Sequence, residues 1–119
     1  MLRSVDTIRI FTRDLGRARR FYGDMLALET ERAEPSFAIF VLDGVRILVE
    51  QVASDDAEGQ GLVGRFLGVS FRVDDAHSAY RRLKERGVDF VQAPEKQTWG
   101  GVLAFARDPD GNVLTLVSG

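Results

Sequence analysis

The side chains with the clearest capacity for chemistry are charged residues inside segments with a strand-like pattern. In those segments apolar residues alternate with other types, and this period of two predicts strands that bury one face. The charged residues of the other faces are Arg9, Arg46, Glu50 and Arg72. Guanidinium groups bind carboxylates and phosphates through paired hydrogen bonds, which indicates anion recognition. Two alternatives stay open: Glu50 acts as an acid or base, or it simply pairs with Arg9 or Arg72.

The composition excludes several other kinds of site. The chain has 119 residues, no cysteine and one histidine, His77. A disulfide framework, a thiolate nucleophile and a cysteine-ligated zinc are therefore excluded. Lys plus Arg is 16 and Asp plus Glu is 18, and the resulting net charge of −2 argues against a nucleic-acid-binding protein. No apolar run reaches the length of a membrane span and the N-terminus lacks a signal-peptide pattern, so we expect a cytoplasmic protein without a membrane partner.

The pattern along the chain predicts the same order of elements twice. Helices are expected after Asp14 and Asp75, whose carboxylates can accept hydrogen bonds from the first helical turn. The predicted strands are 5–12, 28–33, 37–42 and 45–52, then 67–73, 88–92, 102–107 and 113–117. We therefore predict a single α+β domain over 1–119, built from two tandem β-α-β-β-β modules. Module one covers about 1–52, a polar, glycine-rich linker covers 53–66 and module two covers about 67–119.

Two segments carry a resemblance to a known family: RDLGRARRFYGDMLAL at 13–28 and WGGVLAFARDPDGNVLTLV at 99–117. They resemble the first helix and the last hairpin of the vicinal oxygen chelate superfamily of glyoxalases, dioxygenases and bleomycin-resistance proteins. The duplicated order of elements extends the resemblance over nearly the whole chain. It implies a curved mixed sheet around a cavity, with helices on the convex face, and a homodimer that completes the cavity.

Enzymes of this family hold one divalent metal with His, Glu and Gln ligands from the first and last strand of each module. The resemblance places these positions at Thr7, Leu48, Gly68 and Thr115. Threonine is a weak neutral donor, and leucine and glycine offer no side-chain donor, whereas divalent ions bind carboxylate, imidazole or thiolate groups. His77 falls in the second predicted helix, where we expect an ordinary helix residue. We therefore predict no metal and no other cofactor.

The cavity wall follows from strand alternation and from the pairing around two turns. Around Asp43-Gly44 and Asp110-Gly111, the predicted pairs are Ile39 with Leu48, Val41 with Arg46, Ala106 with Thr115 and Ala104 with Val117. The small side chains of the second module predict space for a ligand beside its wall. The candidate ligand contacts are Thr7, Arg9, Ile39, Arg46, Leu48, Glu50, Ser70, Arg72, Trp99, Ala106 and Thr115.

Two further features have open interpretations. Trp99, beside two glycines, either caps the cavity and stacks on a planar ligand or fills space against a partner. The arginines around the first helix form either an anion patch or, as we favour, a solvated face.

Together these features predict a small-molecule-binding protein that resembles the bleomycin-resistance proteins and sequesters its ligand without a metal. The inward arginines favour an anionic or aromatic ligand. A lyase, isomerase or transferase that uses Glu50 as acid or base is the alternative function.

Overall fold

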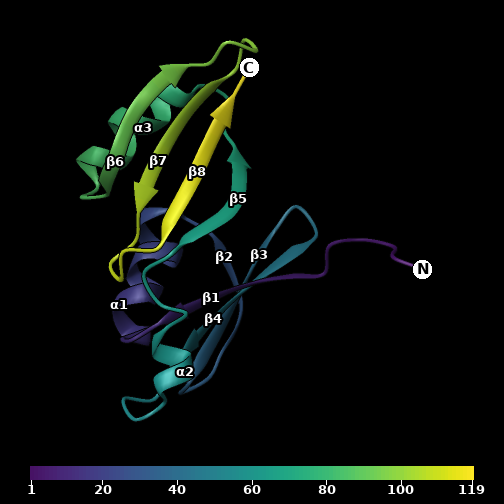
Figure 1. The fold of residues 1–119 in the computed structure, drawn as a ribbon, viewed down its shortest axis with the longest axis vertical. Coiled ribbons are helices and arrows are strands. Elements are labelled where there is room, and N and C mark those ends of the chain that lie inside the picture. Colours follow the sequence, from purple (N-terminus) through teal and green to yellow (C-terminus); the bar gives the residue numbers. More distant parts are fainter. The chain divides into compact units, whose positions relative to one another are not determined.

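The computed structural model describes residues 1–119 and divides into two compact units, Met1–Val63 and Gly64–Gly119, each with its own sheet (Figure 1). The strand orders are β1-β4-β3-β2 in unit one and β5-β8-β7-β6 in unit two, four strands in each. This arrangement confirms the predicted α+β fold with two β-α-β-β-β modules. None of the helices is both long enough and apolar enough to cross a membrane.

Unit one follows the predicted order closely. Its elements are β1 (Thr7–Thr12), α1 (Leu15–Arg19), the π-helical η1 (Arg20–Met25), β2 (Glu29–Ala33), β3 (Phe37–Leu42), β4 (Val45–Gln51) and α2 (Ala57–Gln60). Asp14 caps α1 as predicted, because its carboxylate accepts a hydrogen bond from the Arg17 amide at 3.1 Å. Asp43 and Gly44 have φ of 49° and 80°, the pair of positive angles that a two-residue hairpin turn needs. The short helix α2 lies inside the segment that we expected to be a linker.

The helices α1 and η1 of unit one cover one face of its sheet. Ile10, Phe40 and Ile47 point to that face and are fully buried, and the Tyr22 ring of η1 lies 6.2 Å from the Phe40 ring. The predicted pairs across the β3–β4 hairpin, Ile39 with Leu48 and Val41 with Arg46, are both observed. The opposite face is free of α1 and η1, and we call it the helix-free face of unit one; it includes Thr7, Arg9, Phe11, Ile39, Arg46, Leu48 and Glu50.

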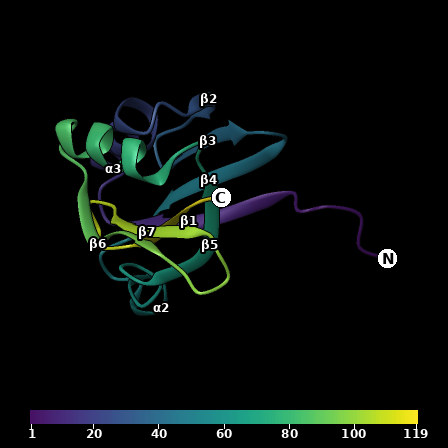
Figure 2. The same cartoon turned by 90° about the horizontal axis from the view of Figure 1, so that it is seen from above.

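Unit two contains β5 (Phe66–Arg72), α3 (Ala76–Glu85), β6 (Asp89–Lys96), β7 (Val102–Arg107) and β8 (Val113–Ser118). The helix α3 lies on one side of β6 and β7 in both views (Figures 1 and 2). Strand β6 is longer than the predicted strand at 88–92, because two register shifts against β7 let it continue through Glu95 and Lys96. The helix-free face of unit two includes Phe66, Ser70, Arg72, Leu103, Phe105, Thr115 and Val117.

The predicted register of the last hairpin is wrong by one residue. The observed pairs are Phe105 with Thr115 and Ala104 with Leu116, in place of Ala106 with Thr115 and Ala104 with Val117. The turn is the cause: the Asp108 amide donates to the Asn112 carbonyl at 2.9 Å and closes a longer turn than the two-residue turn assumed. Because strand side chains alternate, this shift exchanges the two faces of β7.

Ala104 and Ala106 therefore lie on the helix face of the sheet and are fully buried. Phe90 pairs with Ala106 across β6 and β7, and its ring stands edge-on to the Tyr80 ring of α3 with 4.7 Å between the centroids. The expected shallow ligand wall of Ala104 and Ala106 is thus absent from the helix-free face. Phe105 takes that position and makes this wall aromatic.

A buried amide network joins the β7–β8 turn to the start of β5. Asn112 is fully buried, and its Oδ1 accepts hydrogen bonds from the amides of Gly64 and Arg65 at 2.9 and 3.2 Å. Its side-chain Nδ2 donates to Asp108 Oδ2 at 2.9 Å, and its backbone N–H donates to Asp108 Oδ1 at 2.9 Å. The segment at 108–112, one basis of the family resemblance, therefore connects the β7–β8 turn to the start of β5 within unit two.

We predict that Asn112→Ala lowers the free energy of unfolding by about 2–4 kcal/mol, because buried groups left without a partner cost about 1–3 kcal/mol each. Urea denaturation measures the change. The control is Asp55→Ala, because Asp55 is exposed in the loop that precedes α2. This substitution should change stability by less than about 0.5 kcal/mol. A loss at Asn112 no larger than the control's would contradict the role of the network.

Candidate functional site

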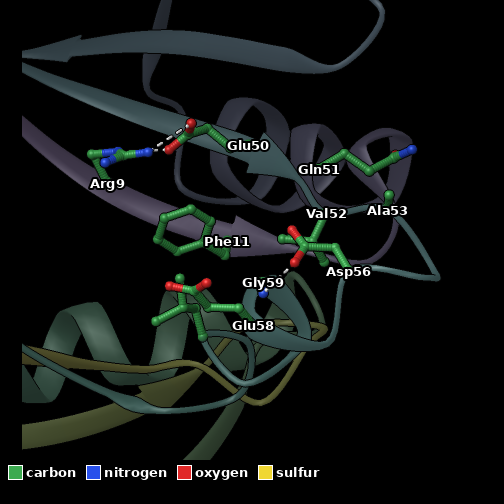
Figure 3. Close-up of a pocket in the computed structure, with 10 residues that line it drawn as sticks. Arg9, Phe11, Glu50, Gln51, Val52, Ala53, Asp56, Glu58 and Gly59 are labelled. Carbon is green, nitrogen blue, oxygen red and sulfur yellow. Dashed lines mark hydrogen bonds and ion pairs between the residues drawn. The ribbon is translucent and has the colours of Figure 1, made fainter.

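An open groove of ≈ 520 Å³ lies between the sheet of unit one and the segment that carries α2 (Figure 3). The sheet contributes Arg9, Phe11 and Glu50, and the 52–62 segment contributes a second wall that includes Glu58 and Leu62. All of the lining residues belong to unit one. The groove therefore brings together two predicted site residues, Arg9 and Glu50, with a segment that we had expected only to link the modules.

The second wall is held by hydrogen bonds within its own segment and by one from Arg13. Asp56 Oδ1 accepts from the Gly59 amide at 2.9 Å and so caps α2. Gln60 Nε2 donates to the Ala53 carbonyl at 3.0 Å, and Arg13 Nε donates to Gln60 Oε1 at 2.7 Å. One arginine from the basic region around the first helix thus has a structural role, in positioning α2.

Arg9 and Glu50 form a two-point ion pair at the rim of the groove (Figure 3). Arg9 Nε donates to Glu50 Oε2 at 2.8 Å and Arg9 Nη2 donates to Glu50 Oε1 at 3.0 Å. The Arg9 guanidinium also lies 5.3 Å from the centre of the Phe11 ring. The side chains are 59% and 26% exposed, so water screens the pair.

These contacts fix the charge state of Arg9. Its pKa is raised, first by the hydrogen bonds to Glu50 and then by Coulombic attraction to the same carboxylate. Arg9 therefore stays protonated, with the Glu50 carboxylate at hydrogen-bond distance from its guanidinium. The purely structural interpretation of Glu50, a pair with Arg9, is the arrangement observed.

Arg46 is neutralised in the same way, by partners outside the groove. Its Nε and Nη2 donate to Glu31 of β2 at 3.0 and 3.2 Å, and Asp6 lies 3.9 Å from its Nη1. The pKa of Arg46 is raised, chiefly by the hydrogen bonds to Glu31. The sequence did not identify Glu31 as a partner of Arg46. Glu31 belongs to the weak predicted strand at 28–33, which lies next to β3 in the sheet.

The remaining predicted site residues are distributed over both units. Thr7, Ile39 and Leu48 lie on the helix-free face of unit one, outside the lining of the groove. Ser70, Arg72 and Thr115 lie on the helix-free face of unit two, where Thr115 is buried and the other two are exposed. Ala106 lies on the helix face, as described above. Trp99 is 66% exposed in the β6–β7 turn, and its ring covers Gly101, where any Cβ atom would overlap the indole.

The chain matches the model of the Glyoxalase/Bleomycin resistance protein/Dioxygenase superfamily over residues 4–116, and it belongs to this superfamily. A crystal structure of a superfamily member from Sphaerobacter thermophilus is 31% identical, with a TM-score of 0.79 over 99% of this chain and 98% of that one. The uncharacterized protein YetH of Bacillus subtilis is 23% identical over 126 residues, 98% of each chain. A bleomycin resistance protein of Klebsiella pneumoniae is 40% identical over 53 residues, which cover 39% of this chain and 42% of the relative.

The residues at the metal positions that the resemblance implies do not fit a metal ion. Thr7 Oγ1 donates to Asp6 Oδ2 at 2.6 Å, and Leu48 and Gly68 have no donor atoms in their side chains. Thr115 offers a single neutral hydroxyl. No group of three or more His, Cys, Asp or Glu side chains is placed to hold a metal ion anywhere in the structure. These four side chains therefore do not supply the donor set that a divalent ion prefers.

Gly68 has a backbone role instead. Its φ of 73° lies in the left-handed region, at the irregularity where the register of β5 against β8 shifts. A Cβ atom at this position would meet nothing within 4 Å, so the constraint comes from the backbone alone.

We predict that Gly68→Ala destabilises the protein by about 1–2 kcal/mol, the cost of the left-handed conformation for a residue with a Cβ atom. Gly68→Asn should lose less, because asparagine tolerates this conformation better. Thermal unfolding of both variants measures the difference. An Ala variant as stable as the parent, or an Asn variant that loses more than Ala, would contradict the backbone explanation.

Proposed function

We propose that the protein binds a small molecule on the helix-free faces of its sheets and does so without a metal ion. The groove of unit one carries this proposal, because it combines apolar surface from Phe11 and Leu62 with polar groups from Arg9, Glu50 and Glu58. Such a mixture orients a ligand while burying its apolar part. Membership of a superfamily whose proteins bind small molecules supports the same function.

The bleomycin-resistance branch supplies the particular mode of action that we propose, sequestration. The 53-residue match to the Klebsiella pneumoniae protein supports this branch for part of the chain. We further propose that the chain acts as a homodimer, since the resemblance implies a cavity that a second copy completes. The ligand is expected to carry an aromatic part, which the Phe11 ring can contact.

Catalysis by Glu50 is the second candidate function, and the position of this carboxylate at the groove supports it. As a base, Glu50 would have to release Arg9, which now occupies both of its oxygens. No histidine lines the groove beside it, and His77, the single histidine, lies in α3. Binding therefore requires fewer groups than catalysis does, and we favour binding.

We predict that the melting temperature rises with a bound ligand and stays constant with metal ions. A ligand at a hundred times its Kd adds about 2.7 kcal/mol to stability, which is several degrees for a domain of this size. A thermal-shift screen of small aromatic acids, alcohols and amines, run beside Zn²⁺, Ni²⁺, Mn²⁺ and EDTA, measures both effects.

The two parts of that screen have separate consequences. A ligand-dependent shift that persists in EDTA supports the proposal. A shift with a divalent metal that EDTA reverses would contradict its metal-free part. A complete absence of shifts from small molecules would contradict binding itself.

A further inference from the structure

The arginines of the two helix-free faces differ in whether they form ion pairs. In unit one, Arg9 pairs with Glu50, and Arg46 pairs with Glu31 and Asp6. In unit two, Arg72 is exposed at the end of β5 and forms no ion pair or side-chain hydrogen bond. Among the arginines predicted to bind an anion, Arg72 is thus the one whose guanidinium retains its full set of donors.

The surroundings of Arg72 on the same face are apolar and aromatic. Arg72 lies beside Val117, which lies beside Leu103 in the next strand. Phe105 is two residues further along β7, and its ring stands edge-on to that of Phe66, with 6.2 Å between the centroids. Phe66 is 62% exposed, so this aromatic pair presents surface that a flat ring can cover.

Trp99 lies at the same end of the sheet as Arg72. The β6–β7 turn that holds Trp99 leads directly into β7, whose first residue, Val102, pairs with Ser118 at the end of β8. Figure 1 shows this turn and the C-terminal end of β8 at one end of unit two. Arg72 and Leu103 are two strand spacings of about 4.8 Å apart, with Val117 between them. A ligand ring that lies over Val117 and Leu103 therefore extends from the Arg72 guanidinium toward the turn that holds Trp99.

The charged and polar neighbours of Arg72 define what kind of group it can accept. Ser70, two residues earlier on the same face, is exposed and its hydroxyl makes no hydrogen bond. Asp74 follows Arg72 closely in sequence but forms no ion pair with it. Glu95 lies in the same row, three strands away, and opposes an anion there only at long range. An unpaired guanidinium beside a free hydroxyl matches a carboxylate.

From this juxtaposition we infer a binding site for planar aromatic carboxylates on the helix-free face of unit two. Arg72 and Ser70 hold the carboxylate, and Leu103, Phe105 and Trp99 contact the ring. The inference rests on the proposed function, because it names the class of small molecule that the protein takes. It also assigns Trp99 a role that the groove of unit one does not give it.

The single tryptophan of the chain is a built-in reporter for this site. Three probes of one shape and different charge, 4-nitrobenzoate, 4-nitrobenzamide and 4-nitrobenzylammonium, are titrated while Trp99 fluorescence is followed. Quenching of free N-acetyltryptophanamide is subtracted as the collisional background. Calorimetry on the same samples detects binding anywhere on the protein.

We expect saturable quenching by the carboxylate, with weak or no saturation for the amide and the ammonium probe. Arg72→Gln should weaken carboxylate binding about tenfold or more, the size of a charge-assisted two-point contact, and Arg72→Lys should weaken it less. Glu95→Gln should tighten binding slightly. Arg82→Gln, an exposed arginine on α3, is the matched control and should leave binding unchanged.

Two results would overturn the inference, and they have different consequences for the proposed function. Calorimetric binding that is indifferent to probe charge and to Arg72→Gln would refute this site and leave the proposed function standing. If no probe binds saturably at millimolar concentration, this site is refuted, and the thermal-shift screen then decides the proposed function separately. Arg72→Gln melting at the parent temperature shows that any lost binding comes from the site.

Discussion

Each of the two sheets has a helix packed on one face, α1 in unit one and α3 in unit two, and both units are built on the difference between that face and the other. Strand alternation then divides each sequence segment between a core and an open surface. In β1 it gives Ile10 to the core and Arg9 to the open surface, and in β4 it gives Ile47 to the core and Glu50 to the surface. Any small-molecule site must use residues of the second kind.

The charges on these open surfaces separate the two units chemically. In unit one the arginines form ion pairs, most clearly Arg9 with Glu50. The segment that carries α2 forms one wall of the groove there. Unit two leaves Arg72 unpaired beside an aromatic wall. Neither surface groups three or more His, Cys, Asp or Glu side chains, the donors that divalent metals prefer.

The sequence predicted what depends on local periodicity and missed what depends on longer-range contacts. The alternation around Arg9 and Glu50 and the Asp43-Gly44 turn were sufficient for the correct faces and register of unit one. The β7–β8 register failed because the side chain of Asn112, bonded to residues 64 and 65, stabilises a longer turn than the glycine alone indicates. The groove wall at 52–62 was missed because a polar, aperiodic segment gives no signal of what it packs against.

We propose that the chain holds a small organic molecule and no metal ion. Native mass spectrometry tests it most directly, on protein equilibrated with a cell extract, desalted and measured before and after denaturation. We predict a mass excess that leaves on denaturation as an organic ion, with no divalent metal in either spectrum. A divalent metal retained at one per chain, or a bare chain mass after every extract, would contradict it.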